Sequence, residues 1–169
     1  NDTAFRTVQT APTISEYPYY QDFENGQEGW EIGGTSSSWA FGTPAKATIT
    51  GTASGVNAFV TGGLGTTQYN NNENSQVRSP CFDLTGAEGD LWVAADIWWN
   101  SEFSWDGTVL QYSTDSGATW TNVGAYLDPN NWYTDNTING SPGGQSEGWS
   151  GRASSSNGSG GWVLAKHTL

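Results

Sequence analysis

Two acidic residues with a spacing that could support catalysis lie in the segment "EFSWDG". Glu102 and Asp106 are four residues apart across a predicted turn, so their carboxylates could approach the separation used by glycosidases. We favour a structural turn instead, because Gly107 follows directly and the neighbouring sequence offers no cluster of basic or amide side chains to position a substrate. An oxygen-coordinated ion at this turn is a further alternative.

A second group of oxygen ligands is predicted in the segment "DFEN". If residues 20–24 form a strand, Asp22 and Glu24 point to the same face, and Asn57 of "GVNAF" could add a third oxygen. The single cysteine and single histidine exclude a zinc site of the CxxC type and a thiol pair, so a metal would be a hard, oxygen-coordinated ion such as Ca²⁺. The alternative is a pair of solvated carboxylates at a sheet edge.

The most sharply defined motif is "STDSGATW", which resembles the Asp-box hairpin of sialidase propellers. Asp115 is expected to accept hydrogen bonds from the backbone of its own turn, and Gly117 to supply a positive φ. The motif occurs once, whereas a propeller repeats it in each blade of about 40–50 residues. It also lacks a nucleophile with a base, so we interpret it as a structural turn and set the sialidase hypothesis aside.

Composition restricts the possible partners. The chain has 169 residues, the size of one domain, with 5 Lys and Arg against 17 Asp and Glu, a formal charge of −12. Nucleic acids and anionic membranes both require a basic surface, so neither is an expected partner. The longest apolar run, "LWVAADIWW", is far shorter than the roughly 20 residues of a membrane helix. With 23 glycines and 10 tryptophans, the chain reads as extracellular or displayed at a cell surface.

Hydrophobic periodicity predicts strands and no helix. Short β-rich runs are separated by Gly, Asn, Ser and Pro clusters, which is typical of an all-β sandwich. Leu91–Trp99 is apolar on both faces and is expected either to be covered on both sides or to line a groove. We expect strands at Tyr20–Glu24, Trp39–Phe41, Ala58–Thr61, Gln76–Asp83, Leu91–Trp99, Thr108–Ser113, Thr119–Val123 and Trp162–His167.

Aromatic residues suggest a second kind of site. Residues 128–161 form a long polar excursion, rich in glycine and asparagine, and excursions of this length are usually functional or partly disordered. Flat aromatic rings stack on sugars, although core packing is the more frequent role of any single tryptophan. The candidates for ligand binding are Trp98, Trp105, Trp132, Tyr133 and Trp149.

An ordered set of segments resembles the MAM-like jelly-roll domains of secreted bacterial proteins. The set is "DFENGQEGW", "WAFGTP", "GVNAFVTG", "QVRSPCFDLTG", "WWNSEFSWDGTVLQYSTDSGATWTNVG", "NWYTDNTINGSPGGQSEGWSGR" and "GWVLAKHTL". The resemblance implies a two-sheet antiparallel β-sandwich over residues 18–169, after an N-terminal linker at residues 1–17. It is strongest to the versions in large cell-surface adhesins and gliding-motility proteins exported by the type IX route.

The same resemblance implies a function and partners. It implies a non-catalytic adhesion or interaction module, outside the cell, with possible binding to surface glycans. A carbohydrate-binding or accessory module of a secreted hydrolase or metalloprotease is the alternative. Related jelly rolls hold a structural Ca²⁺ with a carboxylate placed like Glu24. They also continue past the segment "GWVLAKHTL" through further strands, so we expect the continuation of the chain or a neighbouring subunit to complete the sandwich by strand addition.

Overall fold

The computed structural model describes residues 12–169, and this part of the chain is all β, as the sequence predicts. Two short 3-10 turns are its helical segments, and neither has the length or apolar character of a membrane span. The elements are β1 (Thr13–Ile14), β2 (Glu31–Thr35), β3 (Ala40–Gly42), β4 (Ala58–Val60), β5 (Asn74–Arg78), β6 (Cys81–Phe82), β7 (Trp92–Ile97), β8 (Gln111–Tyr112), β9 (Thr121–Asn122), η1 (Pro142–Gly144), η2 (Ala153–Ser155) and β10 (Val163–Thr168).

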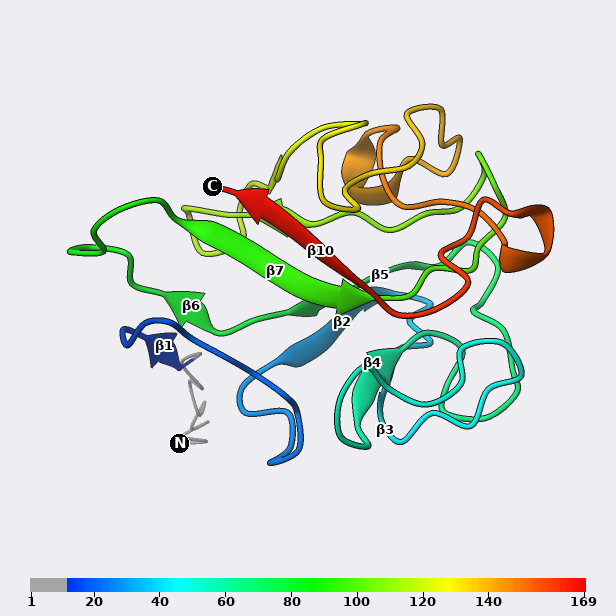
Figure 1. Cartoon of the computed structure of the whole chain (residues 1–169), viewed down its shortest axis with the longest axis horizontal. Helices are drawn as coiled ribbons and strands as arrows, with labels where there is room; N and C mark the ends of the chain where they lie inside the picture. Colours follow the sequence, from blue (N-terminus) through cyan, green and yellow to red (C-terminus); the bar gives the residue numbers. More distant parts are fainter. Residues whose placement is uncertain (1–11) are drawn as a thin grey trace, which may run out of the picture.

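The described strands pair two by two. Antiparallel pairs join β2 to β5, β3 to β4, β7 to β10 and β8 to β9, whereas β1 and β6 are parallel. Figure 1 shows β7 and β10 crossing the middle of the molecule, with β1 to β6 on one side and the loops of residues 113–160 on the other. The antiparallel β character is therefore as expected, but the pairs do not join into the two continuous sheets of a jelly roll.

The principal core lies on one face of the β7–β10 pair. Buried Val123, Trp132, Tyr133, Trp149 and Ala165 form one cluster, and half-buried residues of β7 and its surroundings pack against it. These include Val93, Ile97 and Trp99, which the strand pattern of residues 91–99 places on the same face. Of the two alternatives expected for this strand, cover on both faces is wrong, because Trp92 on the opposite face is 53% exposed.

The long excursion after β9 is an integral part of this core. Backbone bridges pair Thr108 with Trp149 and Asp135 with Gly148, and Ile138 is completely buried. Gly148 permits the approach, since a Cβ there would lie 2.5 Å from the Thr108 carbonyl oxygen. The segment is therefore ordered and contributes to the core, in contrast to the functional or partly disordered excursion that its polar composition suggests. Its few aromatic residues supply part of the apolar surface that β7 and β10 bury.

A second aromatic cluster lies beside β3 and β4. Phe23 makes edge-to-face contacts with Trp30 and Phe59, at ring-centroid distances of 5.4 and 5.2 Å, and Phe41 lies 5.1 Å from Phe59. All four rings are half-buried. This cluster joins the segment before β2 to the β3–β4 hairpin.

Several sequence expectations need correction. Residues 20–24 form a turn instead of a strand, since Phe23 has a φ of 65°, a left-handed conformation that ends extended structure. The run expected at residues 76–83 divides into β5 and β6 at Pro80, which has no N–H for a ladder bond. The glycine-containing β2 was not predicted as a strand. Gly34 is required there, because a Cβ would lie 2.4 Å from the Asn74 carbonyl oxygen.

Part of the expected linker at residues 1–17 is packed against the body. Thr13 and Ile14 pair with β6, and the Tyr17 hydroxyl donates to the carbonyls of Ile14 and Asp83 at 3.0 and 2.9 Å. Residues 1–11 lie outside the described residues. The other expected strands coincide with β3, β4, β7, β8, β9 and β10, with shifted or shortened ends.

Candidate binding cleft

A polar cleft of about 330 Å³ lies between the loops that flank β4 and the segment that follows β7. The residues after β3, those after β4, the two residues Asn100 and Ser101, and Arg152 form its walls. Hydroxyl and amide groups dominate the lining, which suits hydrogen bonding to a polar ligand. The lining residues are Lys46, Ala47, Thr48, Ile49, Thr61, Thr66, Thr67, Gln68, Tyr69, Asn100, Ser101 and Arg152.

Lys46 holds one wall of the cleft together. Its ammonium group lies within 3.2 Å of four backbone carbonyl oxygens, those of Gly62, Gly63, Gly65 and Thr67. An ammonium has three hydrogens, so it shares them among these four acceptors. The Lys46 charge thus orders the loop between β4 and β5, whose residues 66–69 line the cleft.

Tyr69 and Asp106 join that wall to the turn after β7. The Tyr69 hydroxyl donates to Asp106 Oδ2 at 2.7 Å and accepts the backbone N–H of Glu102 at 3.3 Å. Burial, together with the hydrogen bond to Asp106, raises the pKa of Tyr69 to about 12. Tyr69 is therefore a neutral donor at physiological pH, and it ties the loop after β4 to the turn after β7.

The segment Glu102–Asp106 forms the turn predicted from its sequence. The Asp106 backbone N–H donates to the Glu102 carbonyl at 2.9 Å, and the hydroxyls of Ser101 and Ser150 both donate to the Asp106 carbonyl. The two carboxylates have different partners: Asp106 binds Tyr69, while Glu102 lies 3.7 Å from the Arg152 guanidinium, with both side chains exposed. Both groups thus serve the walls of the cleft.

The Asp115 hairpin is confirmed as a local structural unit. Asp115 Oδ1 accepts the Thr119 backbone N–H at 2.8 Å, and Oδ2 accepts the Thr119 hydroxyl at 2.6 Å. These bonds lower the pKa of Asp115 to about 2. Gly117 has a φ of 86°, as expected, and the turn connects β8 to β9.

Three of the five aromatic ligand candidates are core residues, which contradicts the stacking role predicted for them. Trp132, Tyr133 and Trp149 are 3%, 1% and 5% exposed, and each side chain bonds to a backbone carbonyl. Trp98 is half-buried and packs edge-to-face on Trp162. Trp105 is 59% exposed, in the turn whose Asp106 contacts the cleft, so it alone of the five presents a largely free ring.

The predicted metal ligands are only partly brought together. Glu24 Oε1 accepts the backbone N–H groups of Val56 and Asn57, each at 2.9 Å, and Asp22 Oδ1 accepts the N–H of Glu24 at 3.0 Å. These oxygens therefore face N–H donors in a turn, whereas Ca²⁺ takes six to eight oxygen ligands. Residues 12–169 contain no group of three His, Cys, Asp or Glu side chains placed to hold an ion. The placed residues do not form a complete calcium shell.

Sequence reasoning missed two carboxylates that organise loops. Glu73 accepts the backbone N–H groups of Ser38 and Asn70 at 2.8 and 3.0 Å, and Ser75 Oγ donates to it at 2.6 Å. Buried Asp135 accepts from Thr137 and from Ser104 Oγ. Burial raises the pKa of each group, but their hydrogen bonds outweigh it and the pKa falls below the usual range. Only the Asp-x-Thr spacing at Asp135 gave a local signal.

His167 lies in β10, as expected. Its Nε2 atom is 3.0 Å from Asp128 Oδ2, and its ring packs 4.9 Å from Trp132. A hydrogen bond from the Ala125 backbone, together with His167, lowers the pKa of Asp128. The pair closes the loop of residues 125–131 over the core.

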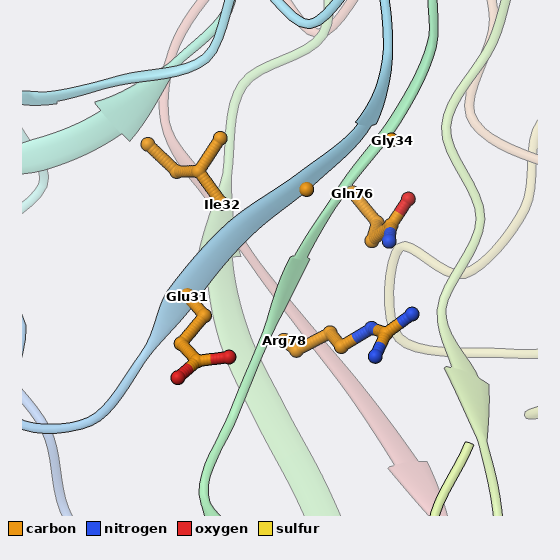
Figure 2. A pocket seen from close by; sticks show the side chains of 6 residues that line it. Glu31, Ile32, Gly34, Gln76 and Arg78 are labelled. Atoms are coloured by element: carbon orange, nitrogen blue, oxygen red, sulfur yellow. The ribbon is translucent and has the colours of Figure 1, made fainter. Parts of the chain in front are cut away.

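A second, shallower hollow of about 200 Å³ lies on the β2–β5 pair. Figure 2 shows Gln76 and Arg78 projecting from β5, with Glu31 and Ile32 on neighbouring β2. The Arg78 guanidinium lies 5.5 Å from the ring centroid of Trp120 and so links this pair to the Asp115 hairpin. The lining of this hollow has fewer residues and fewer kinds of polar group than the lining of the polar cleft, so the cleft is the better candidate site.

Comparison of the chain with protein-family models, curated proteins and solved structures found no match.

Proposed function

We propose that the chain is a non-catalytic interaction module that binds polar ligands, foremost surface glycans, through the cleft between Lys46 and Arg152. The observation that carries the proposal is the lining of that cleft, in which hydroxyl and amide groups stand on walls braced by Lys46 and by Tyr69. Sugars present many hydroxyls, and a preorganised set of donors and acceptors recognises them without losing much side-chain entropy.

The setting that we propose is the outer surface of a bacterial cell. The resemblance to MAM-like domains of adhesins and gliding-motility proteins, exported by the type IX route, supports this setting, as does the charge of −12. The carboxylate pair at Glu102 and Asp106 supports a non-catalytic role, because each member is engaged in bracing the cleft. We propose strand addition from the chain's continuation or a neighbouring subunit as a second mode of interaction.

The test is binding of the full chain to a glycan array and to intact bacterial surfaces. Gln68→Ala removes an exposed amide from the cleft and should weaken binding roughly tenfold, the loss expected for about one hydrogen bond. Gln27→Ala, an exposed glutamine outside the cleft, is the matched control and should bind like the wild type. Equal binding by both variants would remove the cleft from consideration. Glycan hydrolysis that disappears in Glu102→Gln would overturn the non-catalytic assignment.

A carbohydrate-binding or accessory module of a secreted hydrolase or metalloprotease is the second candidate. The exposed Trp105 ring favours it, because a free aromatic face suits stacking on a sugar ring, and Trp105 directly precedes Asp106, which binds the cleft residue Tyr69. In that case Trp105→Ala should reduce retention on insoluble polysaccharide at least as strongly as Gln68→Ala. If Trp105→Ala retains full affinity, the stacking hypothesis fails.

A further inference from the structure

The outer edge of β7, the side that faces away from β10, has backbone groups that no strand among residues 12–169 pairs with. Register pairs Val93, Ala95 and Ile97 with His167, Ala165 and Val163. The Leu169 N–H donates to the Leu91 carbonyl at 2.8 Å, and hydrogen-bonded positions recur at every second residue of an antiparallel pair. The backbone groups of the odd-numbered residues therefore face β10.

The groups of the even-numbered residues consequently point away from β10. Among residues 12–169, no second strand pairs with β7, so Trp92, Ala94 and Asp96 present their N–H and C=O groups along an open edge. Trp92 and Asp96 are also exposed. The edge of a six-residue strand is a template for pairing with another extended chain.

The outer edge of β10, by contrast, is closed by its own chain. The Lys166 N–H donates to the Asn130 carbonyl at 3.1 Å, and the Asn131 side-chain amide donates to the Leu164 carbonyl at 2.9 Å. Residues 130–131 thus occupy the positions that an incoming strand would need. Strand addition to this pair is therefore directed to β7.

Two indole groups at the end of the β7–β10 pair lack a hydrogen-bond acceptor within the described residues. Trp98 directly follows β7 and Trp162 directly precedes β10, and their rings pack edge-to-face with centroids 6.0 Å apart. Both indole nitrogens are buried and have no hydrogen-bond partner within the described residues. Buried N–H groups in native proteins are nearly always paired, with protein or with bound water, so these two indoles are sensitive reporters for a chain that binds near residue 96.

We propose that the outer edge of β7 binds an extended segment of a neighbouring polypeptide, with alternating side chains and a Lys or Arg placed against Asp96. This inference rests on the proposed interaction function and specifies its strand-addition mode. The basic residue follows from charge: Asp96 is exposed on the edge, and the chain carries −12. A second copy is disfavoured as the occupant, because it would bring the same negative charge to the interface.

The experiment uses the full chain, labelled with ¹⁵N, and eight-residue peptides of alternating valine and threonine in both registers, with a central arginine or a central glutamate. In the free protein, amide exchange should be fast at residues 92, 94 and 96 and slow at 93, 95 and 97. The arginine peptides should slow exchange at the first set at least tenfold and shift the indole resonances of Trp98 and Trp162. The glutamate peptides should do neither.

Two variants locate the contact. Asp96→Lys should reverse the preference from the arginine to the glutamate peptide, whereas Glu88→Lys, the same change at an exposed loop position, should leave it unaltered. Ala94→Pro removes one outward N–H without touching a bond to β10 and should abolish binding. Because Asp96 is exposed, its variant tests the proposal even if the proline variant fails to fold.

Three results would contradict pairing at the outer edge of β7. Protection of residues 92, 94 and 96 in the free monomer, equal binding of both peptide types, or no protection by any peptide would overturn the edge proposal. Protection that rises with protein concentration, with a dimer in sedimentation, would assign the edge to a second copy instead. Loss of arginine-peptide binding in Asp96→Lys with intact glycan binding would support the edge proposal separately from the glycan proposal. A protein that binds the arginine peptide but no glycan would refute only the proposed function.

Discussion

Replacing Lys46 with methionine tests whether the ammonium group is the organising centre of the cleft wall. Lys46→Met keeps the length and apolar stem of the side chain but removes all donors to the carbonyls of Gly62, Gly63, Gly65 and Thr67. The contacts to Gly62 and Gly63 are partly buried, and the other two are exposed. Solvent screens the exposed pair, so most of the effect comes from the buried pair.

The magnitude follows from those two bonds. A hydrogen bond to a charged group stabilises the native state by about 1.5–3 kcal/mol when it is protected from water. Removing the ammonium also relieves its own desolvation, which offsets part of the loss. We therefore expect the free energy of unfolding to fall by about 2–3 kcal/mol, which corresponds to a drop in Tm of roughly 4–12 °C for a chain of this size.

The assay is urea unfolding followed by tryptophan fluorescence, with calorimetry as a second measurement. Lys166→Met is the matched control, because Lys166 is exposed and lies 4.2 Å from the ring centroid of Trp92, a contact worth about 0.5–1 kcal/mol. If Lys46→Met costs no more than Lys166→Met, the carbonyl cluster does not stabilise the loop. Glycan binding measured on the folded variant then shows whether the wall also positions the ligand.

Three further predictions concern individual ionisable groups. Hydrogen bonds lower the pKa of Asp115 to about 2, so its stabilisation of the hairpin should be complete above a pH of about 4 and should disappear as the pH falls through 2. Asp115→Asn should remove this pH dependence in NMR titrations of Tyr112. The pKa of Tyr69 is raised to about 12, so its stabilisation of the native state is complete below a pH of about 10 and is lost as the pH rises through 12. Tyr69→Phe should therefore flatten the alkaline part of a plot of unfolding free energy against pH. If Glu24 helps to bind Ca²⁺, a chelator should lower the Tm, because up to about 2.7 kcal/mol of unfolding free energy is lost when an ion present at 100 Kd is removed. Glu24→Ala should remove most of that response. An unchanged Tm in chelator would exclude a stabilising ion.

Features that depend on neighbours in sequence could be predicted from the sequence. The Asp115 hairpin forms through contacts that span no more than four residues, from Ser113 to Gly117 and from Asp115 to Thr119. The Glu102–Asp106 turn is local in the same sense. Strand pattern likewise identified β7 and β10, because alternation of apolar and polar side chains is a property of the segment itself.

The pairs and clusters that join distant segments could not be predicted in this way. Composition indicated a functional or partly disordered excursion at residues 128–161, yet Trp132 and Trp149 lie in the core, because β7 and β10 require apolar cover and these rings supply part of it. The expected strand at residues 20–24 failed for a related reason. Glu24 meets the backbone of Val56 and Asn57, more than thirty residues away, and its turn presents the carboxylate to those N–H groups.

The sequence by itself determined that this protein is an acidic, all-β chain with two well-formed acidic turns and without a basic surface. These properties follow from composition, from the alternation of side chains within a segment and from contacts between residues that are close in sequence. They do not depend on how distant segments pack together. The tertiary structure alone decided that Lys46 binds carbonyls 16 to 21 residues away, that Tyr69 meets Asp106, and that within residues 12–169 β7 pairs on one edge. Each of these depends on which distant segments come together, and that choice is made by the burial of the whole chain and not by any one segment of it.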